Sequence, residues 1–97
     1  MRVVSLKTLR VFWEIHPDAE QPLRAWYAIA RRAQWRTPAD IRAVYSSASF
    51  VGKNRVIFNV KDNDYRLIVL AEYSKGKLFI RFVGTHADYD RINAGTI

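Results

Sequence analysis

Three polar side chains in the second half of the chain have the types that RNA cleavage requires. Arg66 stands at the start of a predicted strand, and His86 and Tyr89 follow a later strand within one predicted helical turn. Cleavage through the ribose 2′-hydroxyl needs a base for the 2′-OH proton, a cation for the phosphorane charge and an acid for the 5′-oxygen. Residues three apart on a helix share a face, so His86 and Tyr89 should point the same way. We therefore take Arg66, His86 and Tyr89 as candidate catalytic residues.

Each of these side chains also has a purely structural interpretation. The His86 ring could cap its helix, Tyr89 could pack against the core, and Arg66 could pair with Asp64 or Glu72. Their joint position at one edge of the predicted sheet favours the catalytic interpretation, because structural roles would not require the three to converge.

Other kinds of site lack the residues they need. The chain has no cysteine, and its two histidines, His16 and His86, stand far apart with no His-x-x-x-His pair or acidic cluster. It also has no glycine-rich phosphate loop and no Gly-x-Ser-x-Gly turn. We expect neither a metal ion nor a cofactor.

The charge of the chain favours a polyanionic partner. Sixteen Lys and Arg oppose nine Asp and Glu, giving a formal net charge of +7 on 97 residues. Arginines outnumber lysines, and a guanidinium group matches phosphate geometry better than an ammonium does. A solvated basic surface is the alternative, above all for the arginines on the predicted helices. The candidate RNA-binding residues are Lys53, Arg55, Asn59, Lys61, Arg31, Arg32 and Arg36.

The first half of the chain is predicted to be helical after a short strand over residues 1–4. Ser5, Asp18 and Thr37 are candidate N-caps, for amphipathic helices that end near residues 16, 35 and 44.

The second half is predicted to be a strand meander. β-Branched and aromatic residues indicate strands over 55–60, 65–73 and 78–83. Residues 46–49 should form a loop, Gly84 should end the last strand, and Thr85 should cap a helix over 86–92. We expect an α+β fold in one domain, residues 1–97, with N-terminal helices packed on one face of an antiparallel sheet and a short C-terminal helix. In such a meander, Asn59, Lys61, Arg66 and His86 can meet at one edge.

No apolar run approaches the roughly 18 residues that a membrane span needs. The N-terminal residues also lack the apolar stretch of a signal peptide. We expect no membrane association and a cytoplasmic location.

Two segments resemble the HigB toxins, a family within the RelE superfamily. They are residues 55–68 (RVIFNVKDNDYRLI) and 79–92 (FIRFVGTHADYDRI), and residues 37–41 (TPADI) match a similar stretch in the helical half. The resemblance covers nearly the whole chain and implies a RelE-like fold and cleavage of mRNA on the translating ribosome. It also implies neutralisation by a cognate, HigA-like helix-turn-helix antitoxin, with contact to operator DNA only through the toxin–antitoxin complex.

The resemblance extends to individual residues. Arg66 matches the catalytic-arginine strand of the superfamily, and His86 stands where several of its toxins place a catalytic histidine. Tyr89 matches a C-terminal aromatic residue of the family, and Lys53 and Lys61 are candidates for the lysines that precede the catalytic strand. A basic C-terminal tail is missing from this sequence.

Two other classes of function stay open at this point. A non-catalytic RNA- or ribosome-binding module would use the basic helices alone, and an interaction subunit would use only the open sheet face to bind a protein.

Overall fold

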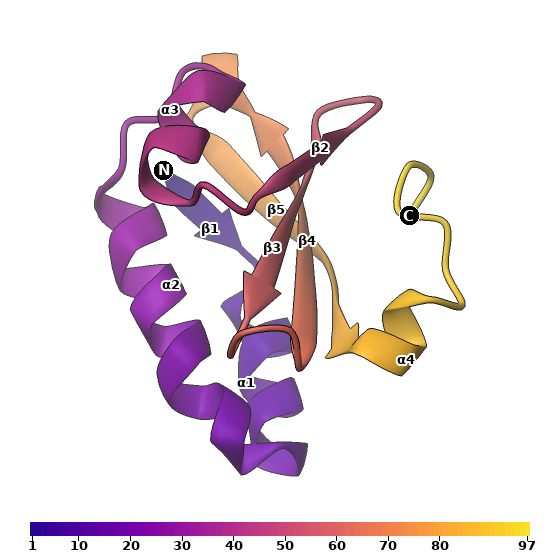
Figure 1. Cartoon of the computed structure of the whole chain (residues 1–97). Coiled ribbons are helices and arrows are strands. Elements are labelled where there is room, and N and C mark those ends of the chain that lie inside the picture. Colours follow the sequence, from indigo (N-terminus) through magenta and orange to yellow (C-terminus); the bar gives the residue numbers. More distant parts are fainter.

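The computed structural model of the chain describes residues 1–97, with most of the helices in the first half and four of the five strands in the second (Figure 1). The helices are α1 (Leu6–Ile15), α2 (Glu20–Arg32), α3 (Pro38–Val44) and α4 (His86–Tyr89), and short 3-10 helices occupy Pro17–Ala19 and Tyr73–Lys75. The strands are β1 (Arg2–Val4), β2 (Ser49–Val51), β3 (Arg55–Val60), β4 (Tyr65–Glu72) and β5 (Lys77–Thr85). None of the helices is both long enough and apolar enough to span a membrane.

The five strands form one open sheet in the order β1-β5-β4-β3-β2. Strands β2 to β5 pair antiparallel, which confirms the predicted meander, whereas β1 pairs with β5 in parallel. The α+β class is confirmed, but the sheet is mixed rather than wholly antiparallel. The edge strand β2 was not predicted, because its three residues are too few to show an alternating pattern.

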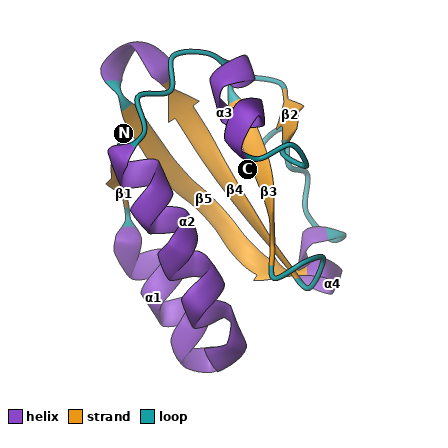
Figure 2. Cartoon of the chain, turned by 60° about the vertical axis from the view of Figure 1, so that its left-hand side comes forward, coloured by secondary structure: helices purple, strands orange, loops and turns teal.

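Helices α1 and α2 cover one face of the sheet (Figures 1 and 2). Every second residue of β3 faces them, and the Phe58 side chain is only 1% exposed. The Phe58 ring lies 5.5 Å from the ring of Trp26 on α2 and 6.4 Å from that of Trp35. This aromatic cluster joins the helical half to the meander.

The helix boundaries differ from the prediction at α2. Thr37 caps α3 through a reciprocal pair of hydrogen bonds with Asp40, as expected, but Ser5 makes no capping bond with its side chain. Asp18 caps no helix either, because its carboxylate binds Lys61 of the β3–β4 turn and Tyr65 of β4 instead. Helix α2 ends at Arg32 rather than near Trp35, since the chain becomes extended at Ala33 and carries the Trp35 ring into the core.

The other face of the sheet carries α4 and the segment that follows it (Figure 1). The prediction that Gly84 ends the last strand was wrong, because β5 continues through Gly84 to Thr85. Gly84 pairs with Arg66 of β4 and is buried. A Cβ atom at Gly84 would lie 2.5 Å from the Phe82 ring and 3.2 Å from the Cβ atom of Asp88. Because Gly84 has no side chain, the Phe82 ring and Asp88 of α4 can both pack directly against its main chain.

Candidate active site

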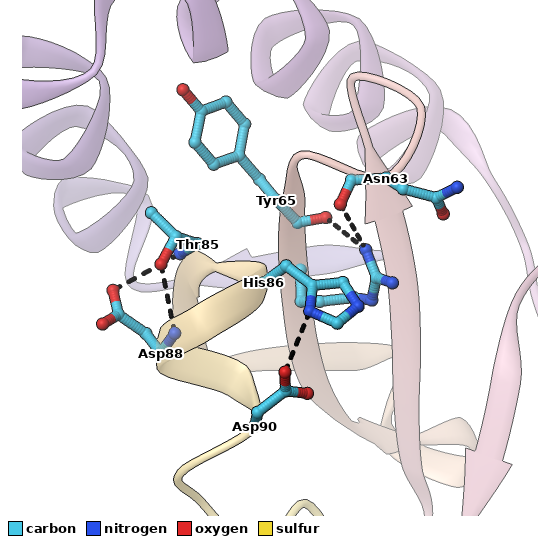
Figure 3. Close-up of polar contacts among 7 residues, drawn as sticks. Asn63, Tyr65, Thr85, His86, Asp88 and Asp90 are labelled. Carbon is cyan, nitrogen blue, oxygen red and sulfur yellow. Dashed lines mark hydrogen bonds and ion pairs between the residues drawn. The ribbon is translucent and has the colours of Figure 1, made fainter.

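Arg66 is held in place by the turn that precedes its strand. It lies on β4 between Asn59 of β3 and Gly84 of β5, on the face opposite the α1/α2 layer. Its Nη1 donates to the main-chain oxygens of Asn63, at 3.0 Å, and of Tyr65, at 3.3 Å (Figure 3). Asp64 and Glu72 form no ion pair with it, so neither predicted structural pairing occurs. Nε and Nη2 stay available for a bidentate contact with a phosphate.

The position of His86 follows from a helix cap and a contact with the same turn. The Thr85 hydroxyl accepts a hydrogen bond from the Asp88 nitrogen at 3.1 Å, which starts α4 at His86 as predicted. The helix ends at Tyr89 rather than at residue 92. The main-chain nitrogen of His86 donates to the oxygen of Asp64 at 3.1 Å. This bond ties the start of α4 to the β3–β4 turn.

Asp90 holds the ring of His86. The Nδ1 atom of His86 lies 3.1 Å from Oδ2 of Asp90, and both side chains are more than half exposed (Figure 3). A carboxylate at Nδ1 favours the tautomer that carries its proton there. The contact leaves Nε2 as the nitrogen that can exchange a proton with a substrate.

Tyr89 links the arginine to the histidine. Its ring centre lies 5.7 Å from the Cζ atom of Arg66, within the range of a cation–π contact. The same ring lies 6.5 Å from the His86 ring in an edge-on arrangement. The structure therefore brings Arg66, His86 and Tyr89 into one cluster, at the end of the sheet where α4 begins.

The turn over residues 61–64 is itself anchored to the helical layer. Lys61 and Asp62 both have positive φ angles, 50° and 56°, which non-glycine residues seldom adopt. Nζ of Lys61 lies 2.6 Å from Oδ2 of Asp18 and 3.3 Å from Oδ2 of Asp64. The Tyr65 hydroxyl donates to the other oxygen of Asp18. These contacts fix the turn that positions both Arg66 and His86.

The same contacts shift three pKa values. Hydrogen bonds from Lys61 and Tyr65 lower the pKa of the Asp18 carboxyl, because they stabilise its charged form. The carboxylates of Asp18 and Asp64 raise the pKa of Lys61, and the bond to Asp18 raises that of Tyr65. The network is thus most complete when Asp18 is ionised and Lys61 is protonated.

Of the predicted RNA-binding residues in the meander, one is a direct neighbour of the cluster. Asn59 pairs with Arg66 across the β3–β4 ladder. Lys61 is near, but two carboxylates already compensate its charge. Arg55 lies at the opposite end of β3, and its Nη1 donates to the main-chain oxygen of Lys53 in the adjoining turn.

The three arginines predicted from the helical half lie apart from the cluster. Arg31 and Arg32 belong to the last turn of α2, and Arg36 follows that helix. Helix α2 covers the sheet face opposite α4 (Figure 1). A single bound nucleotide could not contact both groups, so any RNA contact of these arginines would be a separate one.

Several residues that shape the site were missed in the sequence. Asp90 stands four residues after His86, a spacing that places side chains together on a helix and could have revealed it. The contribution of residues 63 and 64 comes from main-chain oxygens, which no side-chain pattern signals. Asp18 was assigned to a helix cap. No group of three or more His, Cys, Asp or Glu is arranged to hold a metal ion.

The fold and the cluster together define a class. A five-stranded mixed sheet with N-terminal helices on one face and a short C-terminal helix is an α+β arrangement that agrees with a RelE-like fold. The HigB toxin family, the RelE-like toxic component of a toxin–antitoxin system, matches residues 19–92. This match covers most of the chain, which therefore belongs to the HigB toxin family.

Named relatives are similar over almost their whole length. The mRNA interferase toxin HigB of Escherichia coli strain K12 is 28% identical over 97 residues, covering 97% of this chain and 92% of the relative. The mRNA interferase HigB of Shigella flexneri gives the same identity and coverage. The mRNA interferase HigB of Escherichia coli O6:H1 is 20% identical over 94 residues, which cover 95% of this chain and 91% of the relative.

Proposed function

We propose that this chain is the toxin of a type II toxin–antitoxin module and an endoribonuclease that cleaves mRNA without a metal ion. One observation carries the proposal: Arg66, His86 and Tyr89 form a cluster on the free sheet face of a HigB-family chain. The relatives bear the name mRNA interferase, which supports mRNA as the substrate. The chain would act as one cytoplasmic domain.

The cluster supplies the parts of a transesterification. A base takes the proton of the 2′-hydroxyl, whose oxygen then attacks the adjacent phosphorus while the bond to the 5′-oxygen breaks and an acid protonates that oxygen. The products are a 2′,3′-cyclic phosphate and a 5′-hydroxyl end. Arg66 would bind the phosphorane oxygens through Nε and Nη2. We assign the two proton transfers to Nε2 of His86 and the hydroxyl of Tyr89.

Several partners belong to this proposal. The substrate would be mRNA on the translating ribosome, and the basic residues Arg31, Arg32 and Arg36 on the helical layer would contact ribosomal RNA. Lys53, Arg55 and Asn59 would contact the mRNA, whereas Lys61, which is already paired with Asp18 and Asp64, would hold the turn beside it. A cognate HigA-like antitoxin would neutralise the toxin, and operator DNA would be bound only through their complex.

Primer extension on a reporter mRNA tests this function. The protein should create new 5′ ends at codon positions when ribosomes translate the message. It should also create such ends when it is added to cross-linked ribosome–mRNA complexes that already contain an excess of EDTA over magnesium. Arg66→Ala and His86→Ala should create none. RNA binding without new ends would instead support a non-catalytic RNA- or ribosome-binding module.

A further inference from the structure

Two arginines from different strands converge on one main-chain oxygen. Nε and Nη2 of Arg55 donate to the oxygen of Ile97 at 3.0 and 2.8 Å. Nε of Arg81 approaches the same oxygen at 3.4 Å. Arg55 lies on β3 and Arg81 on β5, with β4 between them. Neither guanidinium group has a carboxylate side chain within ion-pair distance.

A β-bulge explains how Arg81 reaches this face. In the β4–β5 ladder, Ile68 pairs with Phe82 and Val69 pairs with Ile80, so Arg81 is left without a partner. An extra residue in one strand, a β-bulge, bends that strand and redirects the side chain of the extra residue. The bulge therefore brings a second guanidinium group to the oxygen that Arg55 already binds.

Two guanidinium groups that share one acceptor, and that pair with no Asp or Glu side chain, form a site suited to a larger anion. The oxygen of Ile97 here stands in for one oxygen of a phosphate. A phosphodiester offers two non-bridging oxygens that share one negative charge, and two guanidinium groups can bind them together. The oxygen of Ile97 and a phosphate would compete for the same donors.

The location of this pair distinguishes it from the cleavage cluster. Arg55 precedes Asn59 by four residues on β3, and Asn59 is the residue that pairs with Arg66. At the rise of an extended strand, the two positions are about 13 Å apart. A phosphate shared by Arg55 and Arg81 would therefore lie farther along the strands than the phosphate that reacts at Arg66.

We propose that Arg55 and Arg81 form a second phosphate subsite, which binds the backbone of the RNA strand at a phosphate flanking the cleaved one. This inference rests on the proposed function for its ligand, a single-stranded RNA. It gives Arg81 a role in binding that is separate from catalysis.

Binding of uncleavable RNA tests the subsite. The probes are a dinucleotide and an octanucleotide with 2′-O-methyl riboses, and their affinities are measured by fluorescence anisotropy over a range of salt concentrations. Arg81→Ala should weaken octanucleotide binding about tenfold and reduce the salt slope by about 0.7. Dinucleotide binding should not change, because a dinucleotide has only one phosphodiester and the proposed function places that group at Arg66. Arg81→Lys should recover part of the loss.

Arg10→Ala is the matched control, because Arg10 is an exposed arginine on α1 and makes no ion pair. It removes the same charge and should leave both affinities unchanged. The subsite is overturned if Arg81→Ala affects neither probe, if it weakens both equally, or if Arg10→Ala has the same effect. If the octanucleotide affinity depends on Arg81 but the protein cleaves no mRNA, the phosphate subsite is supported and the endonuclease function is contradicted.

Discussion

The main-chain nitrogen of His86 donates a hydrogen bond of 3.1 Å to the oxygen of Asp64, so the first residue of α4 is fixed to the β3–β4 turn. The neighbouring oxygen of Asn63 holds the guanidinium group of Arg66 at 3.0 Å. One turn thus places two groups that lie far apart in the sequence. Their separation is set by main-chain geometry rather than by a direct contact between them.

Arg66→Ala and His86→Ala should each lower mRNA cleavage by at least about 100-fold, because each removes a group that we propose to act on the reacting atoms. Growth arrest on expression should be relieved. Neither side chain belongs to the hydrophobic core, so thermal unfolding should shift by less than about 3 °C. Full toxicity of both folded variants would show that the site is wrong.

Asp90→Asn should lower the kcat of cleavage about tenfold and leave KM nearly unchanged, because the amide no longer holds Nδ1 of His86 as a charged acceptor. Asp62→Asn is the control: it removes a turn carboxylate that pairs with no cation and should not affect kcat. If the two variants cleave mRNA with the same kcat, Asp90 does not contribute to catalysis.

Much of this architecture could be predicted from residue patterns. The strand over residues 55–60 has the predicted bounds, and Thr85 and Thr37 cap their helices as the sequence indicated. These features depend on local chemistry, such as β-branched content and capping hydroxyls. The convergence of Arg66, His86 and Tyr89 was also predicted, because short turns leave a meander few alternative arrangements.

The remaining features depend on contacts between distant segments. The sequence predicted Asp18 to cap a helix, but Lys61 of the β3–β4 turn and Tyr65 of β4 bind its carboxylate instead. Gly84 looked like a strand terminator, but the ladder to β4 continues through it. The bulge at Arg81 leaves no mark in the sequence pattern. In each case, contacts with a segment distant in the sequence determine the structural role of the residue.

Gly84→Ala should destabilise the protein by about 1–3 kcal/mol, because the new methyl group would overlap the Phe82 ring and crowd Asp88 on α4. Chemical denaturation measures this change in the free energy of unfolding. Gly52→Ala is the matched control, since a Cβ atom there meets nothing within 4 Å. If the two variants were equally stable, the close approach of α4 to β5 would be incorrect.

The Asp18 network should make stability depend on pH in a defined direction. The pKa of Asp18 is lowered by folding, so its contribution is complete above the unfolded value of about 3.9 and is lost as the pH falls through the folded value. The pKa of Lys61 is raised above 10.5, so its contribution is lost as the pH rises through the folded value. Asp18→Asn should therefore lower Tm at neutral pH, and the deficit should shrink at both extremes.

Glu14→Gln serves as the comparison for this measurement, because Glu14 is an exposed carboxylate on α1 that forms no ion pair. Its effect on Tm should be small and should show no such dependence on pH. A deficit of Asp18→Asn that stayed constant from acid to alkaline pH would contradict the proposed network.

The most direct test of cleavage through the 2′-hydroxyl uses an mRNA that carries a single 2′-deoxynucleotide at a mapped cleavage position. A mechanism through the 2′-hydroxyl predicts that cleavage at this position disappears while neighbouring sites are still cut. It also predicts that the cut sites carry 2′,3′-cyclic phosphate and 5′-hydroxyl ends. Undiminished cleavage at the deoxy position, or 5′-phosphate ends, would contradict the assignment of Arg66, His86 and Tyr89 to this chemistry.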